Sequence, residues 1–162
     1  MIETKPLYSP EEKRRRDTTP WTLVQGVLAP VQFLVFIVSA VLVIRFLATG
    51  QGESIATASI VLKTMLLYLI MITGCIWEKV VFGKYLFAAA FFWEDVFSML
   101  VLALHTAYLV ALVQNLLPTH QLMLLALAAY FAYLINAAQF LLKLRAARLQ
   151  QQRQASFNEV AA

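Results

Sequence analysis

Long apolar stretches separated by short polar joints dominate the pattern of this chain. Four of them approach or exceed the roughly 20 residues that an α-helix needs to cross the hydrocarbon core of a bilayer. They cover residues 24–47, residues 55–77, a third stretch that begins between 86 and 93 and ends near 116, and residues 122–144. The pattern predicts an all-α, polytopic membrane protein with four transmembrane helices.

Turn-forming and polar residues mark the joints between the predicted spans. Residues 49–53 are rich in glycine, Gly83 and Lys84 interrupt the second joint, and residues 114–120 contain Asn, Pro and His. Such residues favour turns over continued helix. We therefore expect a polar N-terminal arm at 1–20, a four-helix transmembrane domain at 21–145 and a C-terminal tail at 146–162.

The composition fits a membrane protein and excludes most soluble classes. Of the 162 residues, 61% are hydrophobic and 14% are charged, whereas soluble domains are about 45–50% apolar and about 25% charged. So few polar residues cannot cover the surface of a water-soluble globule. The high apolar content also excludes intrinsic disorder. The single cysteine, Cys75, excludes an internal disulfide and any multi-cysteine zinc or iron–sulfur site.

The cations are distributed asymmetrically around the predicted spans. The N-terminal arm holds five Lys or Arg residues, residues 143–153 hold four, and the second joint holds Lys79 and Lys84. The other two joints hold none, apart from Arg45 at the end of the first span. Because Lys and Arg concentrate in cytoplasmic loops, we expect both termini to be cytoplasmic. The net charge of +4 then indicates contact with the lipid bilayer and not with nucleic acid.

Ionisable residues inside the spans are the main functional candidates, since such groups are costly in lipid and commonly mark sites. Lys63 lies near mid-depth in the second span, where a structural partner or an anionic ligand would explain it. Glu78 and Lys79 close this span, and adjacent opposite charges at a helix end commonly mark the membrane interface. Gly74, on the same helix face as Glu78, would leave space beside that carboxyl group.

Glu94 and Asp95 follow a strongly apolar run at residues 86–93. If the helix begins near Trp93, both acids occupy its first turn and favour the positive end of the helix dipole. The run before it is then an interfacial or re-entrant segment. If the helix begins near Leu86, both carboxyl groups lie in apolar surroundings that favour their protonated form. A neutral carboxyl group is what a general acid requires, and neighbouring carboxyls tend to divide into one acid and one base.

His105 shares one face of the third span with Glu94. Their separation of eleven positions amounts to a rotation of roughly 20° and a rise of about 16 Å on an ideal helix. This face is expected to point into the bundle, and His105 is then a packing residue, an axial metal ligand or a proton carrier. Two further polar faces are expected to form interhelical hydrogen bonds or line a ligand pocket: Tyr133, Asn136, Gln139 (or Phe140) and Lys143 in the fourth span, and Gln25, Gln32 and Ser39 in the first.

Several chemistries are excluded by what the sequence lacks. Only His105 lies at membrane depth, so a haem held between two histidines is not supported, and two histidines in all exclude a histidine-rich di-iron centre. There is no P-loop, nucleophile elbow or dinucleotide fingerprint, and the polar residues do not repeat as the rings of a channel. We therefore expect no metal or cofactor of the protein's own.

Six segments between residues 21 and 140 together resemble one family, and the resemblance covers the chain from residue 7 to about residue 149. They are residues 21–30, 56–64, 76–83, 91–99, 105–108 and 135–140, and the most specific sequences among them are W-E-K-V-V-F-G and F-F-W-E-D. The chain resembles the 3-vinyl (bacterio)chlorophyllide hydratases of phototrophic bacteria, also called 2-vinyl bacteriochlorophyllide hydratases.

The resemblance implies a hydro-lyase of bacteriochlorophyll biosynthesis that adds water across the C3 vinyl group of a (bacterio)chlorophyllide. The product carries a 1-hydroxyethyl group, which a downstream dehydrogenase would oxidise to acetyl, and the hydration itself needs no redox cofactor. It also implies a multi-pass protein of the bacterial inner membrane, either the cytoplasmic or the intracytoplasmic photosynthetic membrane. Four short helices leave little room to enclose a chlorin, so a pocket shared within a homo-oligomer or open to lipid is expected.

A mechanism can be built on these residues. An acid protonates the terminal vinyl carbon, and water held by a base attacks the inner carbon, whose positive charge spreads over the macrocycle. We expect Glu94 or Asp95 to be the acid, with the other or Glu78 positioning the water. The competing hypotheses are a non-enzymatic chlorin carrier or a light-harvesting or photosystem assembly factor, for which an axial histidine is enough, and a structural subunit of a membrane complex.

The remaining candidates are expected to bind the substrate. His105 is the candidate axial ligand to the magnesium of the chlorin, and Lys63, Lys79 or Lys84 would pair with the free propionate. The others are expected to cover the ring or line its pocket: Phe91, Phe92, Trp93, Tyr108 and Asn136.

Overall fold

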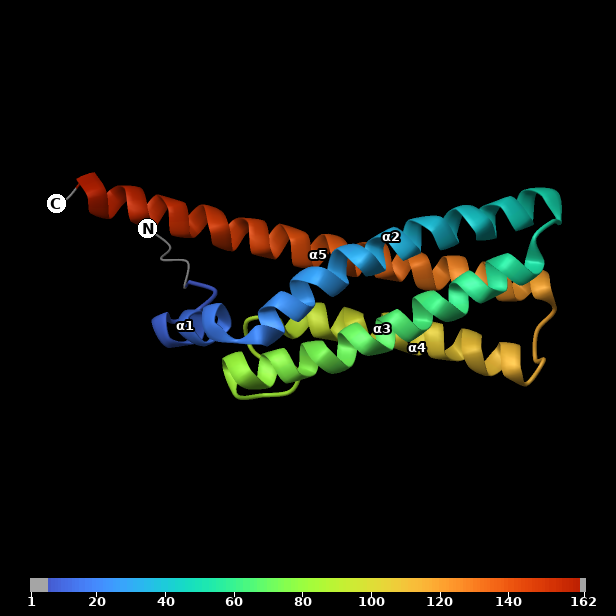
Figure 1. The fold of residues 1–162 in the computed structure, drawn as a ribbon, viewed down its shortest axis with the longest axis horizontal. Helices are drawn as coiled ribbons and strands as arrows, with labels where there is room; N and C mark the ends of the chain where they lie inside the picture. Colours follow the sequence, from blue (N-terminus) through green and yellow to red (C-terminus); the bar gives the residue numbers. More distant parts are fainter. Residues whose placement is uncertain (1–5, 161–162) are drawn as a thin grey trace.

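A computed structural model describes residues 6–160, without the side chains of residues 154 and 157–160. The described chain is helical, as expected, and its helices are α1 (Pro10–Thr18), α2 (Pro20–Thr49), α3 (Glu53–Phe82), α4 (Phe92–Val113) and α5 (Thr119–Val160) (Figure 1). In this part of the chain, four helices, α2 to α5, are long and apolar enough to cross a membrane. The predicted four-span, all-α class is therefore confirmed.

The helices extend past the apolar stretches into the polar flanks and end at the expected turns. Helix α2 ends where Gly50 adopts φ +71°, and α3 ends where Gly83 adopts φ +81°. This left-handed conformation closes a helix and is readily adopted by glycine alone. The joints predicted around residues 49–53 and at Gly83 thus lie where the sequence placed them.

The bundle consists of two antiparallel helical hairpins. Helix α2 packs mainly on α3, and α4 packs mainly on α5, whereas contacts between the hairpins are much sparser. Helix α1 and the C-terminal half of α5 lie at the same end of the bundle (Figure 1). Many large apolar side chains are exposed around the outside, such as Leu23, Ile72 and Val113, which suits contact with lipid rather than water.

The N-terminal arm contains helix α1 and folds onto the bundle, instead of being only a polar extension. Ser9 and Glu12 form a reciprocal capping box that begins α1. The preceding residue, Tyr8, is buried and stacks on Phe82 with ring centroids 5.8 Å apart. Burial raises the pKa of Tyr8, and the nearby Arg16 guanidinium opposes that rise. Tyr8 therefore stays neutral at ordinary pH and serves as an aromatic cover at this end of the bundle.

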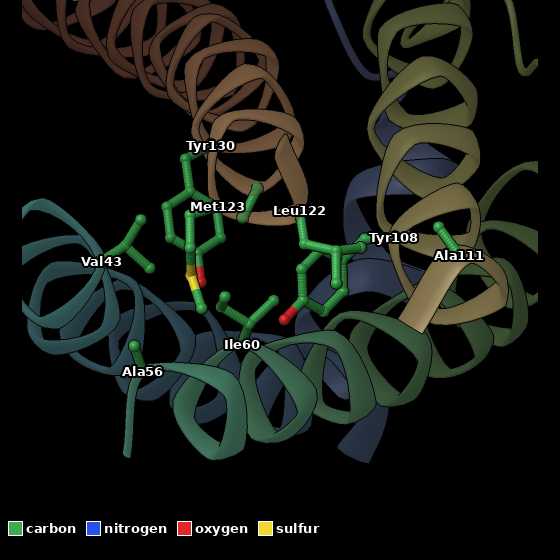
Figure 2. Close-up of a cluster of buried hydrophobic side chains, with 9 residues drawn as sticks. Val43, Ala56, Ile60, Tyr108, Ala111, Leu122, Met123 and Tyr130 are labelled. Atoms are coloured by element: carbon green, nitrogen blue, oxygen red, sulfur yellow. The ribbon is translucent and has the colours of Figure 1, made fainter. Parts of the chain in front are cut away.

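The largest apolar cluster closes the opposite end of the bundle and draws on all four long helices. Figure 2 shows its side chains converging from α2, α3, α4 and α5. Its buried members are Val43, Ala56, Ile60, Tyr108, Ala111, Leu122, Met123, Ala126 and Tyr130. Two smaller clusters follow toward the α1 end, one around Leu67 and Val101 and one around Tyr8 and Phe91. The candidate polar residues lie between these clusters.

Candidate active site

Glu78 and Asp95 form a carboxyl pair between α3 and α4. Their carboxyl groups are close enough to interact with each other, and the two residues expose 6% and 4% of their surface. Because an ionised carboxylate can only accept hydrogen bonds, a hydrogen bond between two carboxyl groups requires one of them to carry a proton. Two neighbouring buried carboxyl groups are therefore a candidate site for a shared proton.

The loop between α3 and α4 supports this pair with its backbone. The N–H of Phe87 donates to Oδ2 of Asp95 at 2.7 Å, and the N–H of Ala88 donates to Oε2 of Glu78 at 3.4 Å. Phe87 adopts φ +59°, a left-handed conformation that is strained for a bulky side chain. Successive N–H groups around such a residue form a concave anion-binding site. The loop is thus shaped to stabilise negative charge on the pair.

The two expectations for the Glu94–Asp95 segment both hold in part. Helix α4 begins at Phe92, so both acids occupy its first turn, and the preceding residues form a loop. Both acids are nevertheless buried, because the loop returns Ala88 and Phe91 to the interior. The side chains therefore combine a helix N-terminal position with apolar surroundings.

Glu94 has a different environment from its neighbour. Its Oε2 lies 2.7 Å from Nζ of Lys143 on α5, in an ion pair at the edge of the interior. Its backbone carbonyl accepts a hydrogen bond from Nδ2 of Asn136 at 2.8 Å and one from Ser98 at 2.9 Å. Glu94 is thus held as a paired carboxylate. The polar face predicted on the fourth span reaches it, although the sequence alone did not pair Lys143 with an acid.

Replacing Lys143 with Met tests this ion pair. The change leaves the nearly buried Glu94 carboxylate without its cation, and an unsatisfied buried charged group costs about 1–3 kcal/mol or more. We expect a lower midpoint of thermal unfolding in detergent, and recovery when Glu94→Gln is combined with Lys143→Met. Equal midpoints for the single variant and the unmodified protein would show that the contact contributes nothing.

A cluster of aromatic rings packs around Phe91, whose ring centre lies 5.2 Å from Nζ of Lys143. Phe91 stacks on Phe140 at 5.7 Å and meets Trp77 edge-on at 5.8 Å. Of the three rings expected to cover the substrate, only Phe91 is buried, whereas Phe92 and Trp93 expose 44% and 66% of their surface. Those two point to the outside, because only one side of the first turn of α4 faces the bundle.

Lys63 and His105 form a second polar centre, in the middle of the bundle. Both are fully buried and close enough to interact electrostatically. Nζ of Lys63 lies 3.8 Å from the centre of the Tyr133 ring. Nδ1 of His105 lies 2.8 Å from the carbonyl oxygen of Val101. A carbonyl can only accept, so Nδ1 carries the hydrogen and Nε2 keeps a free lone pair. Among the described residues, neither Lys63 Nζ nor His105 Nε2 has a hydrogen-bond partner.

The other candidates have different surroundings. Tyr108 is buried in the large apolar cluster at the far end (Figure 2). Lys79 is exposed and donates to the carbonyl of Gly83 at 2.9 Å, and Lys84 is exposed in the following loop. The space beside Gly74, expected next to Glu78, instead faces Gln25 of α2, whose Oε1 lies 3.7 Å from an added Cβ. The structure thus gathers Glu78, Glu94, Asp95 and Asn136 at one site and places Lys63 with His105 at another.

Two neighbouring buried carboxyl groups beside the Glu94–Lys143 ion pair form a candidate acid–base site. A family model described as 2-vinyl bacteriochlorophyllide hydratase (BCHF) matches residues 8–146. A protein of Rhodobacter capsulatus with that same name is 67% identical over 146 residues, covering 90% of this chain and 85% of the relative. Another from Cereibacter sphaeroides, also so named, is 65% identical over 144 residues, covering 88% and 89%. No solved structure matches the chain.

This similarity settles the family. The chain belongs to the 2-vinyl bacteriochlorophyllide hydratase family, as the resemblance in its sequence indicated, and it is a hydro-lyase with a multi-pass membrane fold.

Proposed function

We propose that this protein adds water across the C3 vinyl group of a (bacterio)chlorophyllide to give a 1-hydroxyethyl chlorin in bacteriochlorophyll biosynthesis. The observation that carries the chemistry is the buried Glu78–Asp95 pair. Hydration of an alkene needs a proton donor and a base that holds water, and this pair offers both. The names of the relatives support the choice of substrate.

The backbone of the loop supports a division of roles within the pair. Asp95 accepts the shorter N–H bond, at 2.7 Å, and Glu78 the longer one, at 3.4 Å. Since N–H donors stabilise a carboxylate over a neutral carboxyl group, Asp95 is the carboxylate and Glu78 carries the proton. This proposal differs from the expectation from sequence, in which Glu94 or Asp95 was the acid and the other or Glu78 positioned the water.

The reaction then proceeds in two steps. Glu78 gives its proton to the terminal vinyl carbon, the carbon–carbon π bond breaks, and a cation forms on the inner carbon next to the macrocycle. Water attacks that carbon and gives one proton to Asp95. Transfer of this proton through the hydrogen bond to Glu78 restores the starting state. Glu94, held as a carboxylate by Lys143, stabilises the cation electrostatically.

Lys63 and His105, in the middle of the bundle, support a position for the macrocycle beside α4. The free lone pair of His105 Nε2 is suited to the magnesium of the chlorin, and the unpartnered Lys63 ammonium is suited to the propionate carboxylate. Asp95 and His105 are ten residues apart on α4, a rise of about 15 Å. We place the macrocycle along α4, with its centre toward His105 and its vinyl-bearing edge toward the carboxyl pair. Lys79 and Lys84 are the alternative partners of the propionate, at the exposed loop.

The charge distribution supports an orientation in the bacterial inner membrane. The N-terminal arm holds five Lys or Arg residues and residues 143–153 hold four, and both segments belong to the α1 end of the bundle. That end is therefore proposed to face the cytoplasm. A dehydrogenase that oxidises the hydroxyethyl group and a second copy of this chain are the proposed protein partners.

One assay decides among the candidate functions. Purified protein in lipid nanodiscs is given 3-vinyl bacteriochlorophyllide in heavy-oxygen water, and the pigment is followed by absorbance and mass. The hydratase proposal expects a blue-shifted pigment that has gained one labelled water. Binding without a gain in mass would instead support a pigment carrier or assembly factor, for which the free His105 Nε2 is enough. Neither change would support a structural subunit.

A further inference from the structure

The interface between the two hairpins differs from the interfaces inside them. Within each hairpin the helices pack closely, but α3 and α4 touch each other at few positions. We call this interface the α3–α4 seam, defined by Lys63, Tyr68 and Glu78 on α3 and by Asp95, His105 and Thr106 on α4. The backbones of α3 and α4 are therefore further apart than those within a hairpin, and buried side chains such as Leu67 and Val101 fill the space between them.

Polar side chains face each other across the seam at three levels. The carboxyl groups of Glu78 and Asp95 meet near the α1 end. Lys63 and His105 meet near the middle. The hydroxyl of Tyr68 and Oγ1 of Thr106 form a hydrogen bond of 2.8 Å, with Thr106 exposed on the outer surface. The seam thus carries both candidate substrate-binding centres and closes toward lipid with one hydrogen bond.

Burial restricts how a ligand reaches these groups. Lys63 and His105 are each 0% exposed, so a flat macrocycle contacts them only when α3 and α4 separate. Unpartnered buried polar atoms on both sides, Nζ of Lys63 and Nε2 of His105, are costly in an apolar interior. A ligand with a magnesium ion and a carboxylate would satisfy both atoms at once.

We propose that the α3–α4 seam is the binding site of the chlorin macrocycle and that the chlorin enters it sideways from the bilayer, between Tyr68 and Thr106. This inference rests on the proposed hydratase function and adds the site and its route of access. A largely apolar ring dissolves in lipid, so it arrives at the lipid-facing side of the seam. The Tyr68–Thr106 bond breaks as the ring enters and re-forms behind it.

Joining the two sides of the seam tests the proposal. In a Cys75→Ala background, Tyr68→Cys and Thr106→Cys are linked by a short, reducible bifunctional thiol reagent, since the Tyr68 side chain separates the backbones further than a direct disulfide spans. We expect at least a tenfold loss of hydration rate in nanodiscs after linking and full recovery after reduction. An unchanged rate in the linked protein would overturn the proposal.

A matched control lies inside one hairpin. Ser39 on α2 and Ser59 on α3 have their hydroxyl oxygens 2.7 Å apart, so Ser39→Cys with Ser59→Cys takes the same reagent without joining the hairpins. This linked control is expected to hydrate the vinyl group at the rate of its unlinked form. If it loses activity as well, the loss in the seam variant is a general effect of linking, and the proposal is rejected.

A second variant covers the case in which the cysteine pair is inactive before linking. Tyr68→Phe removes the closing hydrogen bond and keeps the ring. We expect substrate to bind Tyr68→Phe from nanodiscs two- to fivefold faster, and an equal binding rate would overturn the proposal. If the unmodified protein itself adds no water, the proposed function fails, and chlorin binding slowed by the link would still support the seam as the site.

Discussion

Replacing Glu78 with Gln is expected to lower kcat for vinyl hydration by about 100- to 10,000-fold, the contribution typical of a general acid. The amide keeps both contacts of the carboxyl group, because its oxygen accepts from the Ala88 N–H and its NH₂ donates to Asp95. The variant should therefore fold and bind pigment normally, and only the transferable proton is missing. Single-turnover hydration, followed by absorbance, measures the chemical step directly.

Two neighbouring amide variants serve as comparisons. Asp95→Asn removes the proposed base but can still accept from the Phe87 N–H, so a loss of similar size is expected. Glu94→Gln removes only electrostatic support of the cation, so its loss should be smaller than either. If Glu78→Gln and Asp95→Asn both hydrate at the normal rate, the carboxyl pair is not the acid–base site. If Glu94→Gln loses more hydration rate than the other two variants, Glu94 takes part in the proton transfer.

Replacing Lys63 with Met is expected to stabilise the protein and to weaken substrate binding at the same time. Lys63 Nζ is buried without a hydrogen-bond partner among the described residues, and such a group costs about 1–3 kcal/mol. Met has a similar length and adapts well to packed interiors. It cannot reproduce the attraction between the Lys63 ammonium and the Tyr133 ring, which reduces the benefit. A net gain of about 1 kcal/mol would raise the unfolding midpoint by about 2–4 °C.

The substrate's methyl ester separates binding from other effects of this variant. If Lys63 pairs with the propionate, Lys63→Met raises KM for the free acid and leaves KM for the ester unchanged. Lys79→Gln is the matched control, because Lys79 is exposed and already bonded to the Gly83 carbonyl. If KM for the free acid rises more in Lys79→Gln than in Lys63→Met, the propionate binds at the exposed loop. A lower unfolding midpoint in Lys63→Met would show that Lys63 supports the fold.

The fold was predictable from the sequence to the extent that apolar length determines it. Four stretches of spanning length and the turn-forming joints between them specify four helices with little ambiguity. Helix α1 was missed because the arm is polar, yet Ser9 and Glu12 have the spacing of a capping box, which was the available signal. The packing of Tyr8 under this arm depends on tertiary contacts that no local pattern encodes.

The site was predictable along each helix but not between helices. Helical periodicity placed Glu94 and His105 on one face expected to point into the bundle, and the structure buries both. The pairing of Glu78 with Asp95, and of Glu94 with Lys143, depends on the rotation and height of separate helices. The backbone donors of Phe87 and Ala88 depend on the conformation of a loop, which residue identity does not specify.

In the proposed scheme, the position of the carboxyl pair near one end of the bundle lets a lipid-soluble pigment react with water from the aqueous side. Glu78 lies one turn from the end of α3, and Asp95 lies in the first turn of α4, so both stand next to the aqueous boundary. The pigment then reaches the pair from the lipid bilayer, and the water reaches it from the aqueous solution. Such an enzyme resembles a phase-transfer catalyst, and its speed should follow the pigment's concentration in the membrane rather than in the surrounding buffer.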